Sequence, residues 1–220
     1  MTLPGLERLM DVCRHLGFAL WTQPPVHAVP TTAELVGHLP FDPVLAAVYS
    51  RWSKASFATD IAGVVLAGND DSEFSLKSQS TWWREFHQAR VPLPLFIFGG
   101  EPLLAYSYAT VPDLADVQGR QPVVHVDTYE FEGPLIHPVA SNVDRFFDTY
   151  SHFLEEVAVT PEFKKEKEAV LTFPWDVPHL LARDLPLVEL LREGRFASVL
   201  PQDDSTQRWV ERILDIAAGG

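Results

Sequence analysis

The stretch from residue 94 to residue 158 constrains the fold most, because short apolar runs there give way to a helical repeat. The runs are LFIF at 95–98, LLAYSYAT at 103–110 and PVVHVDTY at 122–129, separated by turn residues, which is typical of an antiparallel sheet. From about residue 139 apolar residues recur at helical spacing, with Ser141 or Asn142 placed to cap the helix. Both elements have an apolar side to bury, so we predict an α+β fold in which this helix covers the sheet.

The first part of the chain predicts further helices. Residues 4–16 have an apolar face that ends at Gly17, and they place Cys13 in the core as a structural thiol. The segment WTQPPVHAVP that follows is expected to be a Pro-rich connector, and a short helix capped by Thr31 or Thr32 is expected to stop at Pro40.

Asp42 and Pro43 are typical of a helix start, so residues 42–57 predict another helix. The β-branched run at 61–68 predicts a strand that leads into the acidic turn NDDSE. Residues 81–90 predict a helix, although the adjacent tryptophans are also compatible with the start of a strand.

After residue 158 the composition changes, and prolines divide the remaining chain into short helical segments before a terminal helix. We therefore expect two parts: an α+β domain over residues 1–158, with a single mostly antiparallel sheet flanked by helices, and a helical C-terminal extension over 159–220 packed on it.

Charge narrows the classes of partner. The net charge is −13, and residues 61–158 hold 14 acidic and 5 basic residues, a difference of −9. An acidic surface repels phosphate backbones and anionic lipids, so we expect no nucleic-acid or membrane partner, whereas a basic protein would be attracted. The alternative, given equal weight, is that the acidic surface serves solubility and not the binding of a partner.

The single cysteine excludes an intramolecular disulfide and fits a reducing compartment. The N-terminus lacks the uninterrupted apolar region of a signal peptide, and no stretch is apolar enough to span a bilayer. These features predict a cytoplasmic protein.

Three patterns in the sequence are candidates for a catalytic, metal or cofactor site. His125, Asp127, Glu130, Glu132 and His137 suggest metal ligands, but their spacing lacks the tightness of known motifs, and the polar outer face of a strand is the favoured interpretation. Gly99-Gly100 is interpreted as a turn and residues 69–73 as a solvated loop. No nucleophile motif is present, so we expect no catalytic residues, no metal and no cofactor, with an enzyme of unrecognised type as the alternative.

Trp82 and Trp83 are adjacent, so they cannot both face squarely into one core. One of them is therefore a candidate for a partner surface, since tryptophan is enriched among residues that dominate binding energy.

Four passages resemble the SUKH superfamily, the fold of fungal cell-wall-assembly regulators and of many bacterial immunity proteins. They are LPFDPVLAAVYSRW, LFIFGGEPLLAYSY, PVVHVDTYE and VASNVDRFFDTYSHFLEEV, which together span roughly residues 39 to 157.

The resemblance implies a mixed sheet flanked by helices, no catalytic residues, and binding of a protein partner that in bacterial relatives is a toxin, often a nuclease. We therefore expect an immunity-type protein that binds a basic toxin domain, with a structural or scaffold protein as a further alternative. The expected partner-binding residues are Asp70, Asp71, Glu73, Trp82, Trp83, Asp113, Asp116, Glu130 and Glu132.

Overall fold

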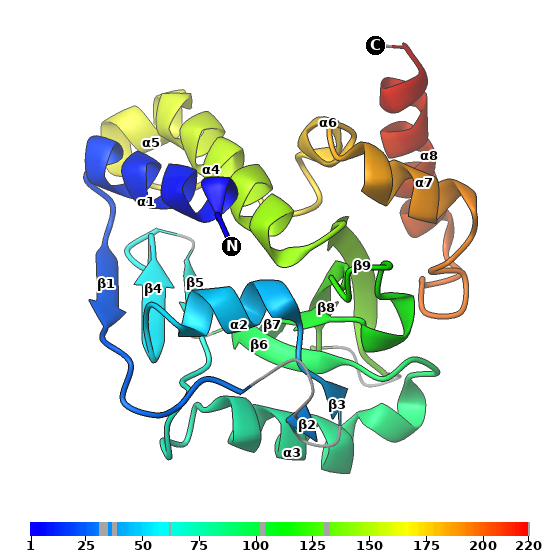
Figure 1. Ribbon diagram of the computed structural model, residues 1–220. Coiled ribbons are helices and arrows are strands. Elements are labelled where there is room, and N and C mark those ends of the chain that lie inside the picture. The colour runs from blue at the N-terminus through cyan, green and yellow to red at the C-terminus, as the bar shows by residue number, and fades with distance from the viewer. Residues whose placement is uncertain (31–34, 37–38, 62, 102–103, 130–132, 220) are drawn as a thin grey trace.

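Seven strands form one antiparallel sheet in the computed structural model of the chain (Figure 1). The structure describes residues 1–30, 35–36, 39–61, 63–101, 104–129 and 133–219. The strand order in this sheet is β1-β4-β5-β6-β7-β8-β9, which follows the order of the strands along the chain. Strands β2 and β3 form a separate two-stranded sheet. The strands are β1 Leu20–Gln23, β2 Leu35–Val36, β3 Leu39–Pro40, β4 Lys54–Phe57, β5 Val64–Leu66, β6 Phe96–Gly100, β7 Tyr106–Thr110, β8 Val123–Asp127 and β9 Leu135–Ala140.

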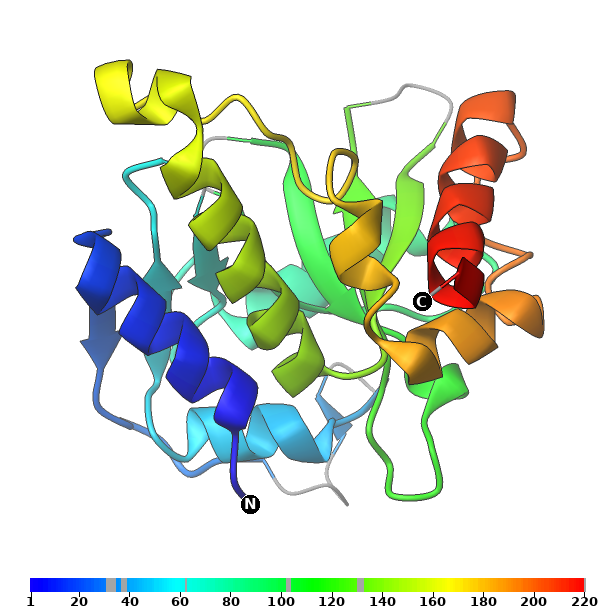
Figure 2. The same cartoon turned by 90° about the horizontal axis from the view of Figure 1, so that it is seen from above.

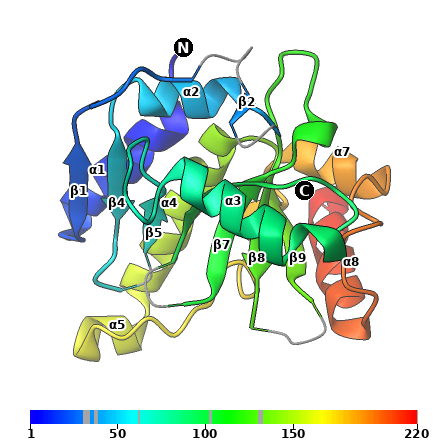
Figure 3. The same ribbon diagram turned by 90° about the horizontal axis from the view of Figure 1, so that it is seen from below.

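Helices cover both faces of this sheet, which confirms the predicted α+β class. Helices α1, α4 and α6 lie on one face and α3 on the opposite one, whereas α7 and α8 lie beyond β9 (Figures 1, 2 and 3). No helix among the described residues has the length and apolar character needed to cross a bilayer. The helices are α1 Pro4–Leu16, α2 Pro43–Tyr49, α3 Leu76–Phe86, α4 Val143–Val159, α5 Pro161–Glu166, α6 Pro178–Leu181, α7 Leu185–Arg192 and α8 Asp204–Gly219, with 3-10 turns at Gln88–Arg90 and Pro112–Leu114.

Helices α1 and α4 pack side by side at unusually short range. A Cβ on Gly5 would lie 2.0 Å from the backbone oxygen of Asp144, so only glycine permits this approach. The Asp144 carboxylate accepts hydrogen bonds from the backbone N–H groups of Gly5 and Leu6, both at 3.1 Å, and so caps α1 from the neighbouring helix. The prediction of a helix over 4–16 is confirmed. Cys13 is buried, and burial raises the pKa of its thiol to about 11, as a structural thiol requires.

The core between α4 and the sheet is aromatic. Tyr108 of β7 contacts Phe146 and Tyr150 of α4, with ring centroids 4.6 and 6.4 Å apart. Phe173, in the segment that follows α5, packs against the same rings at 5.2 to 6.3 Å. Asn142 caps α4 by accepting from the backbone N–H groups of Asp144 and Arg145, in agreement with the sequence.

Three predictions about local structure are wrong. The predicted connector WTQPPVHAVP contains most of β1, which pairs with β4. The helix predicted over 42–57 ends at Tyr49, and residues 54–57 form β4 instead, with alternate side chains buried. The helix predicted to run from Thr31 or Thr32 to Pro40 is replaced at its end by the β2-β3 pair, whereas residues 31–34 lie outside the described residues. For β1 and β4, pairing with a distant segment overrides the local preference, whereas β2 and β3 pair with each other within six residues of chain.

Gly99 and Gly100 do not form the predicted turn but are the last residues of β6. A Cβ on Gly99 would lie 2.8 Å from the backbone oxygen of Val65 in β5, and one on Gly100 would lie 2.8 Å from the oxygen of Tyr106 in β7. Glycine is therefore required here by close contact with both neighbouring strands rather than by a turn.

The C-terminal extension packs against β9 and the start of α4. The buried carboxylate of Asp184 accepts from the backbone N–H of Ser141 at 2.7 Å and from that of Leu187 at 3.4 Å, so it caps α7 and joins this helix to the junction of β9 and α4. His137 of β9 contacts Trp175 and Trp209, with ring centroids 4.1 and 5.5 Å apart. These contacts hold the extension on the sheet.

Candidate protein-binding surface

The loop between β5 and α3 is held by its own polar groups. Ser75 and Ser78 form a reciprocal capping box at the start of α3, with N–H to hydroxyl distances of 2.9 and 3.2 Å. Asp70 pairs with Lys54 of β4 at 2.7 Å and accepts from both the backbone and the hydroxyl of Ser72. Burial raises the pKa of Asp70 and is the largest single effect, but the bonds to Lys54 and Ser72 and the charge of Lys54 together outweigh it, so the pKa lies below its ordinary value. Asp70 is therefore ionised and fixed in place.

Acidic and apolar side chains meet in a hollow on this loop and the outer side of α3. The hollow has a volume of about 410 Å³ and is lined by Asp70, Asp71, Trp82, Glu85 and Phe86 together with several hydroxyl groups and Lys77. The side chain of Asp71 is 96% exposed, and Phe86 is 63% exposed, so both are accessible to another molecule. Figure 3 views α3 from this side of the sheet.

A second hollow, of about 490 Å³, shares Trp82 with the first and reaches the ends of β6 and β7. Its lining includes Phe74, which is 37% exposed, and Glu101. Trp82 therefore forms part of the wall of both hollows. We call the following residues the α3 surface: Asp70, Asp71, Glu73, Phe74, Trp82, Glu85 and Phe86.

The two tryptophans have different environments. Trp82 is partly exposed on the α3 surface, whereas Trp83 is 1% exposed and its indole N–H donates to Gln88 at 3.0 Å. This arrangement agrees with the expectation that Trp82 and Trp83 cannot both face one core. Trp83 is a core residue in this structure, and Trp82 is the one available to a partner.

The other predicted acids do not gather at the α3 surface. Asp113 and Asp116 are both exposed on the segment between β7 and β8, and Asp116 is paired with Arg120 at 2.6 Å. Glu130 and Glu132 lie outside the described residues. The structure therefore places the predicted site residues in separate regions, with Asp70, Asp71, Glu73 and Trp82 forming the coherent group.

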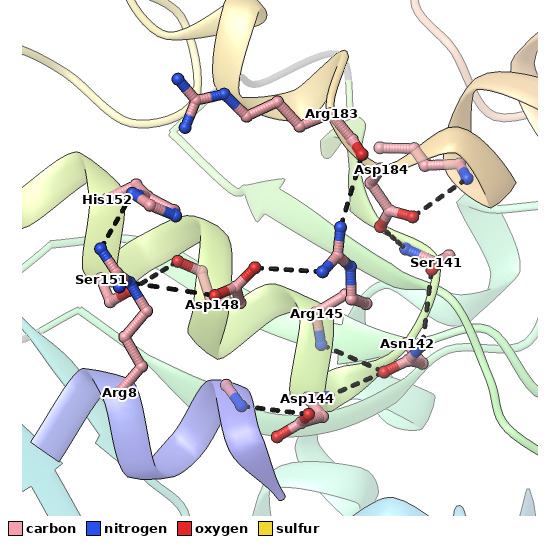
Figure 4. A network of polar contacts seen from close by, with 12 residues as sticks. Arg8, Ser141, Asn142, Asp144, Arg145, Asp148, Ser151, His152, Arg183 and Asp184 are labelled. Atoms are coloured by element: carbon pink, nitrogen blue, oxygen red, sulfur yellow. Dashed lines mark hydrogen bonds and ion pairs between the residues drawn. The ribbon is translucent and has the colours of Figure 1, made fainter.

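Asp116 lines a third hollow, of about 910 Å³, between this segment and the C-terminal extension. The same hollow is lined by Arg145 and Arg183 (Figure 4). Arg145 pairs with Asp148 at 3.1 Å and donates to the backbone oxygen of Arg183 at 3.4 Å. Acidic and basic side chains are balanced here, so this hollow lacks the one-sided charge of the α3 surface.

The histidines weighed as metal ligands lie directly opposite each other on β8 and β9. His125 is 1% exposed and His137 is fully buried, and their ring nitrogens have no hydrogen-bond partner among the described residues. Burial lowers the pKa of His125 to about 3 and that of His137 to about 4, so both rings are neutral. In the part of the chain that the structure describes, no group of three or more His, Cys, Asp or Glu side chains is arranged to hold a metal ion.

Sequence reasoning missed Phe74, Glu85, Phe86 and Glu101. Trp82, Glu85 and Phe86 share a helical face at positions i, i+3 and i+4, a spacing that is visible in the sequence once the start of α3 is known. Glu101 carried no signal of its own, because only the arrangement of β6, β7 and α3 places it in a hollow.

Comparison of the chain with protein-family models, with curated proteins and with solved structures finds no match.

Proposed function

We propose that this protein is a non-catalytic binding module of the immunity type, which neutralises a basic toxin domain by presenting its α3 surface to that domain. The observation that carries the proposal is the partly exposed Trp82 and the exposed Phe86, with Asp71 and Glu85 around the same hollow. Protein interfaces commonly combine aromatic anchors at the centre with a polar rim. The SUKH-like order of elements supports the same class of function.

Charge gives this surface a preference among partners. Asp70, Asp71, Glu73 and Glu85 place four carboxylates on the α3 surface, against two basic groups: Lys54, which pairs with Asp70, and Lys77, which lines the same hollow. A nuclease domain presents a basic cleft to its substrate, and an acidic protein seated there would exclude the phosphates. Complementary charge would also accelerate association, and the acceleration would weaken as salt is added.

The test begins with a toxin-like reading frame encoded next to this protein. The purified product should bind this chain directly, and co-expression of the chain should protect cells from the toxin. Trp82→Ala should weaken binding about 30-fold or more, since a buried aromatic anchor contributes at least about 2 kcal/mol. The double variant Asp71→Lys, Glu85→Lys should lower the association rate about tenfold at low salt.

Asp113→Lys is the matched control, because it reverses an equally exposed acid on a different segment. It should leave the dissociation rate unchanged. If Asp113→Lys abolished binding while Trp82→Ala did not, the α3 surface would be the wrong site. Absence of both binding and protection for every neighbouring toxin would contradict the immunity function itself.

A further inference from the structure

Strand β1 forms an open edge of the seven-stranded sheet. It is the last strand of the sheet on its side, and none of the described elements runs along its outer edge (Figures 1, 2 and 3). The opposite edge is closed, because β9 contains Pro138 and packs against the C-terminal extension. Proteins commonly protect an edge strand with charged residues, proline, a bulge or a covering element. β1 has the sequence Leu-Trp-Thr-Gln and pairs with β4 in a continuous register, so these protections are missing along it.

The pairing with β4 shows which backbone groups of β1 point outward. The backbone N–H of Ala58 donates to the backbone oxygen of Ala19 at 2.6 Å, which fixes the alternation of bonds between the two strands. In an antiparallel pair every second residue bonds to the neighbouring strand. The N–H and C=O groups of Leu20 and Thr22 therefore point away from β4, and they present donors and acceptors on the open edge.

This edge is complementary to itself. Two antiparallel copies of β1 pair when Leu20 of each lies opposite Thr22 of the other, because each such pair exchanges two hydrogen bonds. Pairing centred on Leu20 would need the N–H of Phe18, which already donates to the oxygen of Cys13 at 2.9 Å. Pairing centred on Thr22 would need a donor at Pro24, which has no N–H. Only the register centred between Leu20 and Thr22 uses all the outward groups.

Trp21 lies at the centre of this register. It would face Trp21 of the second copy at a non-hydrogen-bonded position, where opposite Cα atoms approach to about 4.5 Å and the side chains are closest. Trp21 is 53% exposed in the single chain, although tryptophan is on average largely buried. Cross-strand aromatic pairs stabilise antiparallel sheets, so a second copy would cover this indole and gain its contact energy.

Charge favours a second copy at this edge over a basic partner. The side chains of β1 are uncharged, so two copies can pair there without bringing like charges into contact, although each chain has a net charge of −13. A basic strand would find no counter-charge among these side chains.

We propose that the protein forms a two-fold dimer in which the β1 strands of two copies pair antiparallel around Trp21 and join the two sheets. The two-fold axis is then perpendicular to the sheet, so the α3 surfaces of both copies lie on the same face of the joined sheet and outside the pairing edge. The dimer does not depend on the proposed function.

Sedimentation equilibrium of the full chain tests the proposal. The average mass should rise from the monomer value of 24.7 kDa towards twice that value, with a dissociation constant on the order of 0.1 mM, because the contact is smaller than a standard interface. Added salt should strengthen the dimer, since it screens the repulsion between two acidic chains, whereas it should weaken toxin binding. A mass that stays at the monomer value up to about 1 mM, roughly tenfold above that constant, would refute the proposal.

Two variants locate the contact. Thr22→Pro removes an outward N–H and leaves the bonds to β4 in place, so it should abolish the dimer. Trp21→Ala should weaken it about tenfold or more. Phe86→Ala is the matched control, because it removes an aromatic side chain that is 63% exposed on the α3 surface, and it should leave the dimer unchanged. A dimer that is lost in Phe86→Ala and retained in the two β1 variants would overturn the proposal.

Disulfide trapping tests the register and does not depend on the affinity. With oxidised glutathione as the oxidant, Trp21→Cys should form a linked dimer, because the introduced thiols lie opposite each other. Gln23→Cys is the control: its thiols would be separated by about 13 Å along the strands, too far for a disulfide. Cys13 is buried, so the native thiol does not compete. Equal trapping of both variants would contradict the register.

These outcomes are separate from those of the proposed function. A monomeric chain whose Thr22→Pro variant lost toxin binding would assign the β1 edge to a strand of the toxin and overturn the dimer. Dimerisation through β1 without binding of any neighbouring toxin would refute the immunity function and retain the dimer.

Discussion

His137 is a fully buried imidazole at the contact between the sheet and the C-terminal extension, and its replacement by leucine should change how stability depends on pH. The ring contacts Trp175 and Trp209. Neither of its nitrogens has a hydrogen-bond partner among the described residues. Burial lowers its pKa to about 4, and the charge of Asp203 opposes this only in part.

The sign of the effect follows from proton uptake. In the unfolded chain a histidine has a pKa near 6.5, so between about pH 6.5 and pH 4 the unfolded state binds a proton that the native state does not. Stability conferred by His137 is therefore complete above pH 6.5 and is lost as the pH falls. A pH of 5 lies about 1.5 units below the pKa of the unfolded-state histidine, so the free energy of unfolding should be about 2 kcal/mol lower at pH 5 than at pH 7.5.

Urea unfolding at pH 7.5 and pH 5, followed by tryptophan fluorescence, measures this loss. The stability of His137→Leu relative to the unaltered chain should rise by about 2 kcal/mol between the two pH values. Burial raises the pKa of Asp42 to about 6 and that of Glu101 to about 7, so these two carboxyl groups stabilise the native state as the pH falls, opposite to His137. Both groups are present in the variant and in the unaltered chain, so their effect cancels in the comparison.

Val188→Ala is the matched control, because it removes buried volume from α7 without removing a titratable group. Its destabilisation should be the same at both pH values. A relative stability of His137→Leu that does not change with pH would refute the reasoning, since it would mean that the native ring is protonated or that its pKa is not lowered by burial.

Two further predictions concern packing. Asp184→Ala removes the cap of α7 and the hydrogen bond to Ser141, so it should lower the free energy of unfolding by about 2–3 kcal/mol and increase amide hydrogen exchange in α7 and α8. Asp203→Ala removes a cap at an exposed position and is the control. Unchanged exchange in α7 would contradict the role of Asp184. Gly99→Ala forces a Cβ to within 2.8 Å of the Val65 oxygen and should lower stability to urea by about 1–3 kcal/mol, more than Gly219→Ala, where an added Cβ meets nothing within 4 Å. An equal or smaller effect at Gly99 would show that β5 and β6 can move apart.

The bounds of α1 and the start of α4 were predictable, because the signals that set them are local, whereas the helices predicted over 42–57 and 81–90 are Pro43–Tyr49 and Leu76–Phe86 in the structure. Asn142 caps α4 through its own side chain, and Gly17 ends α1 in a left-handed conformation that glycine adopts readily. Both signals lie within a few residues of the helix ends that they define. The acidic excess and the exposure of one of the two adjacent tryptophans were also readable in advance.

The sheet edges were less predictable. Strand β1 is short and lies in a segment rich in proline, so its identity depends on pairing with β4 more than thirty residues away. β4 itself follows α2 without a clear break in apolar pattern. Gly99 and Gly100 have the composition of a turn, and only the neighbouring strands show why glycine is needed inside β6.

By itself the sequence determined the α+β class, the helix that covers the sheet, the placement of Cys13 in the core and the acidic character of the middle of the chain, since each depends on local spacing or on composition. Only the tertiary structure decided which acids lie close together. It separated Asp113 and Asp116 from the group around α3, buried Trp83 and left Trp82 accessible. Residues distant in sequence become neighbours only when strands and helices pack together, so local spacing could not show this grouping.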